Sequence, residues 1–185
     1  GIEDKLEQVA KALDTAQEAL DKQNKEKEEF KDATEKADLT EESLKVALKQ
    51  EIGQGLVSVE KQDDKVIVTV GAGGAFPSGT AQLTPAAKKI MSNIAEINKK
   101  GSSTIKVTGH TDNVPLLFGS QYRDNWDLAA ARAASVVQNL QETNVIDAKR
   151  LIATSKGETQ PVASNQTRQG RSKNRRIEIE INYGK

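Results

Sequence analysis

Residues 104–113 read TIKVTGHTDN, and this stretch decides how the rest of the chain is arranged. The alternating apolar residues of its first half predict a strand, and Asp112 follows just past the strand end, a common position for a binding group. A helical pattern starts near Asp124 and carries Arg132 about two turns later. The sequence therefore places a carboxylate at a strand end near an arginine on the next helix, which suits a zwitterionic ligand better than catalysis.

The segments on either side of this stretch alternate between strand and helix patterns. Thr84 and Pro85 begin a helix that Gly101 ends, and its apolar residues recur at helical spacing. The order is β-β-α-β-α-β-α-β, which predicts an α+β fold, a two-layer sandwich in which helices cover a mixed β-sheet. The expected strands are 56–60, 65–70, 104–109, 151–155 and 177–181, and a second helix is expected at 124–142, with an inward stripe of Leu128, Ala131, Ser135, Val136, Asn139 and Leu140.

Residues 2–37 lack glycine and proline and are rich in strong helix formers. Apolar residues fall in alternating steps of four and three, which is a heptad seam, but the seam breaks at Gln23 and Lys27 before Phe30 restores it. One interpretation is a coiled-coil-like spacer or dimerising arm. The other is a helix that packs on its own domain or stays solvated in a monomer. The seam consists of Ile2, Leu6, Val9, Leu13, Ala16 and Leu20.

A further helix is expected to start at Asp38, because Asp38 can cap it and Glu41 stands at the third helical position of a capping box. This helix should stop at the glycines of 53–55. We therefore expect two parts, a helical arm at residues 1–40 and a globular domain at residues 41–185.

Bulk composition excludes several functional classes. The chain has 27 acidic and 27 basic residues, so its formal net charge is zero, whereas nucleic-acid binders usually carry a basic excess. It has no cysteine, which excludes disulfides, cysteine nucleophiles and thiolate metal sites, and its single histidine excludes a multi-histidine metal site. No apolar run is long enough to span a membrane. We therefore expect no cofactor, no metal and no nucleic-acid partner.

Several polar residues near the predicted strand end have two interpretations each. Asp112 and Arg132 either hold the ammonium and carboxylate of a ligand or pair with each other. His110 has no nucleophile at a recognisable spacing, so a structural role is favoured over general-base catalysis. Trp126 is interpreted as a core anchor, with stacking on a sugar as the alternative. The basic run at 168–176 is either a solvated face or a group that opposes Asp112 or an anionic polymer.

Three motifs resemble the signature of OmpA-like peptidoglycan-binding domains. They are GHTDN at 109–113, NWDLAAARA at 125–133 and NRRIE at 174–178. Within that group, NWDL and the segment GAFPSGTA at 74–81 look like the MotB family of flagellar stator B subunits, and most closely its sodium-driven PomB branch. The resemblance covers roughly residues 44–182.

The resemblance implies a non-catalytic domain that holds the stem peptide of peptidoglycan, with Asp112 and Arg132 at the ends of a diaminopimelate residue. One departure from the family pattern is Ala129, where the family usually has a serine. The resemblance also implies that the rest of the site is formed by Thr111, Asn113, Asn125, Leu128 and Arg176.

The resemblance further implies the periplasmic part of an inner-membrane protein, so a transmembrane helix that contacts the stator A subunit would precede this stretch. Such subunits are homodimers, and the arm would pair across the two-fold axis. The implied function is to anchor a flagellar motor stator to the cell wall. The alternatives are an OmpA-like envelope-tethering protein and a stator-like unit of a non-flagellar machine. An enzyme acting on the wall is disfavoured, because no carboxylate pair or metal set suited to that chemistry is visible.

Overall fold

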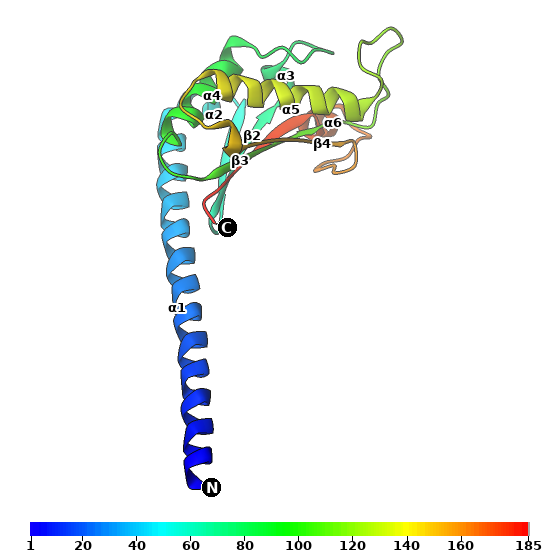
Figure 1. The fold of residues 1–185 in the computed structure, drawn as a ribbon. Coiled ribbons are helices and arrows are strands. Elements are labelled where there is room, and N and C mark those ends of the chain that lie inside the picture. Colours follow the sequence, from blue (N-terminus) through cyan, green and yellow to red (C-terminus); the bar gives the residue numbers. More distant parts are fainter. Residues whose placement is uncertain (185) are drawn as a thin grey trace.

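A long helix, α1 (Ile2–Ala47), projects from a domain built on one five-stranded sheet. Figure 1 shows this arrangement in the computed structural model, which describes residues 1–184: the N-terminal part of α1 extends away from the domain, and α4 and α5 lie over the sheet. The predicted α+β class with a long N-terminal helix is confirmed.

Helix α1 is continuous through Asp38, so the predicted restart at that residue is wrong. The Asp38 carboxylate pairs with Lys61 Nζ at 2.9 Å instead of capping a new helix, because strong helix formers on both sides continue the hydrogen-bond ladder. Burial against the domain begins at Ala33, whereas residues 1–28 are exposed throughout. Within one chain, the heptad seam therefore does not pack on the domain, and a paired arm and a solvated helix remain as the two interpretations.

The sheet has the strand order β1-β2-β5-β3-β4 and is mixed, as predicted. β1 (Val57–Gln62) and β2 (Lys65–Gly71) form the expected hairpin, and β5 (Arg176–Asn182) lies between β2 and β3 (Thr104–His110), antiparallel to both. β3 pairs in parallel with the edge strand β4 (Leu151–Gly157). The C-terminal strand therefore occupies the centre of the sheet, and its first residue lies beside the last residue of β3.

Helices cover one face of the sheet (Figure 1). α4 (Pro85–Ile97) begins where Thr84 Oγ1 accepts a hydrogen bond from the backbone of Ala87, as the cap pattern predicts. α5 (Asn125–Glu142) packs on β3 and β4, and a layer of valine, isoleucine and leucine side chains fills the space between helices and sheet. The remaining elements are α2 (Lys49–Gly53), α3 (Ala72–Ala75), the 3-10 turn η1 (Ala148–Arg150) and α6 (Arg168–Asn174).

The start of α5 lies very close to β3. A Cβ atom on Gly109 would stand 2.2 Å from the backbone oxygen of Ala129, so only glycine permits this approach. The contact turns a different face of the helix toward the sheet, and the predicted inward stripe is wrong at Ala131, Ser135 and Asn139, which are only half-buried. The buried residues of α5 are Leu128, Ala129, Arg132, Ala133, Val136 and Leu140.

Candidate functional site

Asp112 lies two residues after the end of β3, and the residue is 8% exposed. Its Oδ1 accepts a hydrogen bond from the backbone of Val114 at 3.0 Å, which closes a turn that holds the carboxylate in place. Its Oδ2 accepts a hydrogen bond from Arg175 Nη1 at 2.6 Å. The Asn125 side chain donates to the backbone oxygens of Asp112 and Val114 at 3.3 and 3.1 Å. The strand end and the start of α5 are therefore linked directly.

Arg132 projects from α5 and is 6% exposed. Its Nε donates to the backbone oxygen of Thr80 at 2.8 Å, and its guanidinium lies 4.9 Å from the centre of the Phe76 ring, a cation–π contact. Burial lowers the pKa of Arg132; the Tyr122 hydroxyl acts against that shift, and the charge of Arg175 adds to it. Among residues 1–184 no carboxylate forms an ion pair with this guanidinium, so the described part of the chain gives its charge no counter-ion.

Asp112 and Arg132 line the same cavity, which has a volume of about 780 Å³. They do not pair with each other, because Asp112 is bound to Arg175. One carboxylate therefore shares the cavity with two guanidinium groups, so the cavity is positively charged and suits a ligand that brings at least one carboxylate. The residues implied by the family resemblance that line this cavity are Thr111, Asp112, Asn125, Leu128 and Arg132.

Arg176 lines neither this cavity nor the neighbouring one. It is 4% exposed, and its guanidinium donates to Glu178 Oε2 at 2.6 Å and to the backbone oxygen of Asn174 at 2.9 Å. Arg175 faces the cavity in its place, because successive residues of an extended chain point to opposite sides. In the sequence, Arg175 stands out only as a member of the basic run at 168–176. A contact between that run and Asp112 is one of its two interpretations.

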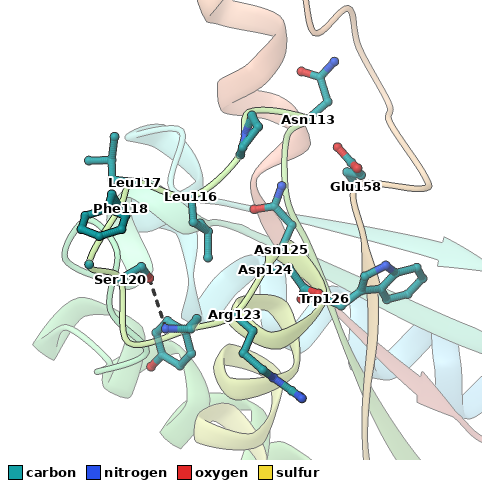
Figure 2. A pocket seen from close by; sticks show the side chains of 13 residues that line it. Asn113, Leu116, Leu117, Phe118, Ser120, Arg123, Asp124, Asn125, Trp126 and Glu158 are labelled. Atoms are coloured by element: carbon teal, nitrogen blue, oxygen red, sulfur yellow. Dashed lines mark hydrogen bonds between the residues drawn. The ribbon is translucent and has the colours of Figure 1, made fainter.

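A second cavity of about 540 Å³ adjoins the first and is drawn in Figure 2. Asn113 lines this cavity rather than the one that contains Asp112. Trp126 also lines it and is 50% exposed, so the prediction that Trp126 anchors the core is wrong. Trp126 stands in the first turn of α5, beside the end of β4. Its indole instead lies against Gly157, where a Cβ atom would be 3.1 Å from the ring.

His110 is the last residue of β3 and is buried. It is 4% exposed, and its Nε2 lies 3.1 Å from Glu178 Oε2, on the central strand. The hydrogen bond with His110 and the charge of Arg176 lower the pKa of Glu178 to about 2. His110 therefore lies against Glu178 on the sheet and lines neither cavity.

Ala129, the departure from the family pattern, lies in the contact between α5 and β3 and not on the cavity wall. In the described part of the chain, no three His, Cys, Asp or Glu side chains are grouped so that they could hold a metal ion. The helices of residues 1–184 include none that is both long and apolar enough to cross a membrane.

Known proteins resemble this chain in sequence and in fold. The sequence profile of the OmpA family matches residues 75–175. Motility protein B of Bacillus subtilis is 41% identical over 120 residues, which are 63% of this chain and 44% of that protein. The peptidoglycan-binding protein ArfA of Mycobacterium tuberculosis is 35% identical over 109 residues, which are 58% of this chain and 32% of that protein. The chain thus spans less than half the length of either relative.

Two solved structures resemble most of this chain. A putative MotB-like protein from Desulfovibrio vulgaris has a TM-score of 0.75 over 84% of this chain and 96% of that chain, at 21% identity, which is a likeness in fold alone. The cell wall anchor of the T6SS from Pseudomonas aeruginosa has a TM-score of 0.67 and 34% identity, and the match covers 75% of this chain and 96% of that chain.

Proposed function

The chain belongs to the OmpA family, and we propose that it is a non-catalytic domain that binds peptidoglycan by the diaminopimelate of the stem peptide. The observation that carries this proposal is Arg132, a buried guanidinium that lines a cavity and has no counter-ion among residues 1–184. An unpaired buried charge is costly, so a ligand that supplies a carboxylate would offset that cost. The free end of diaminopimelate carries a carboxylate and an ammonium on one carbon, which matches Arg132 and Asp112.

The other contacts follow from the lining of the cavity. Thr111, Asn125 and Leu128 line the same cavity as the two charged residues and would contact the body of the diaminopimelate. Arg175 binds Asp112 and lines the cavity in place of Arg176. Peptidoglycan recognition in the relative ArfA, whose name states that activity, supports the same ligand class.

In the organism, the protein would anchor a flagellar motor stator to the cell wall. The similarity to Motility protein B supports this role. In this proposal residues 1–40 are an arm and residues 41–185 are the wall-binding domain, located in the periplasm as part of an inner-membrane protein. The exposed seam of α1 would pair in a homodimer, and the stator A subunit would be reached through a transmembrane segment outside this stretch.

A second candidate is the anchor of a different envelope machine or an OmpA-like envelope tether. The 34% identity to the T6SS cell wall anchor, over nearly the whole of that chain, supports this second candidate. Both candidates require the same wall-binding site and differ only in what the arm is attached to. Loss of swimming on deletion of the gene, restored by the wild-type protein, would separate the stator from the other machines.

Co-sedimentation with purified peptidoglycan tests the binding site. Asp112→Asn and Arg132→Ala should each lower the bound fraction at least about 10-fold, since each removes one charge-assisted contact. Asp21→Asn on the exposed arm and Arg168→Ala on α6 are matched controls that remove the same charges elsewhere and should bind like the wild type. Full binding by both site variants would refute the proposal.

The absence of catalysis is tested in the same samples. After prolonged incubation, the supernatant is analysed for soluble muropeptides by chromatography and mass spectrometry. We expect none above the level of the protein-free control. Release of muropeptides that Arg132→Ala abolishes would replace the binding proposal with an enzymatic one.

A further inference from the structure

Unpaired positive charge is concentrated beside the cavity of the proposed function. Residues 159–177 hold five basic residues and no acidic one, although the whole sequence is neutral, with 27 residues of each sign. Two of the five, Arg175 and Arg176, form ion pairs with carboxylates. Among residues 1–184, no ion pair involves the other three, which are Arg168, Arg171 and Lys173.

Three of the arginines form a row along α6. Arg168, Arg171 and Arg175 are spaced three and four residues apart, so they lie on one side of the helix. The hydrogen bond from Arg175 N to Arg171 O, at 3.0 Å, continues the helical spacing to the end of α6. Arg175 lines the cavity of the proposed function, so this arginine row ends at the rim of that cavity. Figure 1 shows α6 at the end of the domain away from α1.

The helix that carries the row is fixed to the loop that precedes it. The Asn174 side chain is fully buried, and its Oδ1 accepts hydrogen bonds from the backbone of Val162 and Ala163 at 2.7 and 2.9 Å. A Cβ atom on Gly170 would stand 1.8 Å from the backbone oxygen of Ser164, so α6 rests directly on the loop. The backbone of the row is therefore in place before a ligand arrives, which lowers the entropic cost of binding.

We propose that the arginine row binds an anionic polymer of the cell wall whose repeats are joined by phosphodiester groups. Each such group offers one negative charge and two free oxygens, which match the fork of a guanidinium. A polymer brings several of these groups in succession, as the row presents several guanidinium groups. The choice of a wall polymer rests on the proposed function, because the row ends at the cavity that would hold peptidoglycan.

Two other polyanions fit the surface less well. The helix reads RQGRSKN and has no apolar side chain that could enter a bilayer, which disfavours a membrane. Residues 159–177 include no aromatic side chain on which a base could stack, which disfavours a single-stranded nucleic acid.

Co-sedimentation with two wall preparations of one bacterium tests the inference. Intact walls carry poly(glycerol phosphate), and stripped walls have lost it by treatment with hydrofluoric acid. The wild type should bind intact walls roughly 5- to 10-fold more tightly than stripped walls, and this preference should shrink as the salt concentration rises. Arg168→Glu should lose the preference and keep the wild-type affinity for stripped walls, because Arg168 is exposed and does not line the cavity.

Lys173→Glu is the matched control on the same helix. It makes the same change of charge at an exposed residue, but it lies two residues from Arg171 and hence on nearly the opposite side of α6. Lys173→Glu should therefore keep most of the preference for intact walls, and Arg168→Lys should keep part of it. An equal loss in Arg168→Glu and Lys173→Glu would overturn the row, since position on the helix would then not matter.

The source of the phosphodiester is separated by two further probes. Calorimetry should show binding to soluble poly(glycerol phosphate) and none to vesicles that contain phosphatidylglycerol, and binding to the vesicles alone would overturn the polymer. Equal affinity of the wild type for intact and stripped walls would overturn the inference and leave the proposed function intact. Binding to intact walls without any binding to stripped walls would refute the proposed function and support the arginine row.

Discussion

The side chains of Asp112 and Arg132 differ in the bonding partners that they have in the protein without a ligand. Asp112 has Arg175 at 2.6 Å, whereas the partners of Arg132 among the described residues are a backbone oxygen and an aromatic ring. A ligand ammonium must therefore compete with Arg175 for Asp112, while a ligand carboxylate meets a guanidinium without a competitor. We expect Arg132 to contribute more to affinity and Asp112 more to the orientation of the ligand.

Glu178 makes the stability of the domain depend on pH. Its pKa is about 2 in the folded protein and 4.5 in the unfolded chain, so its stabilisation is complete above 4.5 and is lost as the pH falls toward 2. Glu178→Gln should lower the free energy of unfolding by about 1–2 kcal/mol at neutral pH, because His110 and Arg176 lose a charged partner. Urea unfolding at a series of pH values measures this difference. The free energies of unfolding of the variant and the wild type should converge in acid.

Glu180→Gln is the control on the same strand. Its partners, Lys65 and Lys106, lie 3.8 and 3.7 Å away and are exposed, so the free energy of unfolding should change by less than about 0.5 kcal/mol. A gap between Glu178→Gln and the wild type that is the same at every pH would contradict the role assigned to Glu178.

At the scale of elements, the contact between β3 and α5 places the two charged residues in one cavity. Asp112 follows β3 and Arg132 lies on α5, so their separation depends on how closely the helix start approaches the strand. Gly109 is the residue that permits this approach.

Gly109→Ala should therefore destabilise the domain strongly. The added methyl would stand 2.2 Å from a backbone oxygen, which can only be relieved by moving α5, and we expect a loss of at least about 3 kcal/mol in the free energy of unfolding. Denaturant titration followed by circular dichroism measures it. Gly53→Ala is the matched control: nothing lies within 4 Å of its Cβ position, so the change should be neutral or slightly stabilising. Similar midpoints for the two variants would argue against the close contact.

The exposed part of α1 carries its own prediction. Replacing Leu6 and Leu13 by glutamate puts two charges into the seam, where both side chains are more than half exposed in one chain. The double variant should be monomeric by light scattering when the wild type is dimeric, because like charges would face each other across the pair. Gln8→Glu with Thr15→Glu adds the same charge at the same spacing on another face and should remain dimeric. A wild type that is monomeric at all concentrations would refute the paired arm.

At the scale of the whole molecule, a small polar cluster joins the arm to the domain. The Tyr183 hydroxyl, after the central strand β5, bonds with Thr40 on α1 and with Asn98 at the end of α4. Arg150 extends the cluster by donating to the backbone oxygens of Asn98 and Ser103 at 2.7 Å. Any force on the arm would therefore reach the middle of the sheet by a direct route.

Tyr183→Phe should loosen this joint. Thr40 and Asn98 would each lose a partner in a buried setting, and we expect a loss of about 1–2 kcal/mol in the free energy of unfolding. Hydrogen exchange measured by mass spectrometry should accelerate in the C-terminal part of α1 more than in β3. Tyr122→Phe is the control, since its hydroxyl has no hydrogen bond among the described residues and the exchange of α1 should not change. Uniform acceleration across the domain would contradict a local joint.

The sequence by itself determined the strands, the capped helix after Thr84 and the succession of Asp112 and Arg132, because alternation, helical spacing and caps act between residues close in the chain. Only the tertiary structure decided that Arg175 and not Arg176 faces the cavity, that Trp126 lies at the surface and that α1 runs through Asp38. These outcomes depend on contacts between distant segments. Asp112 and Arg175 are 63 residues apart, and only the central position of β5 in the sheet brings them together.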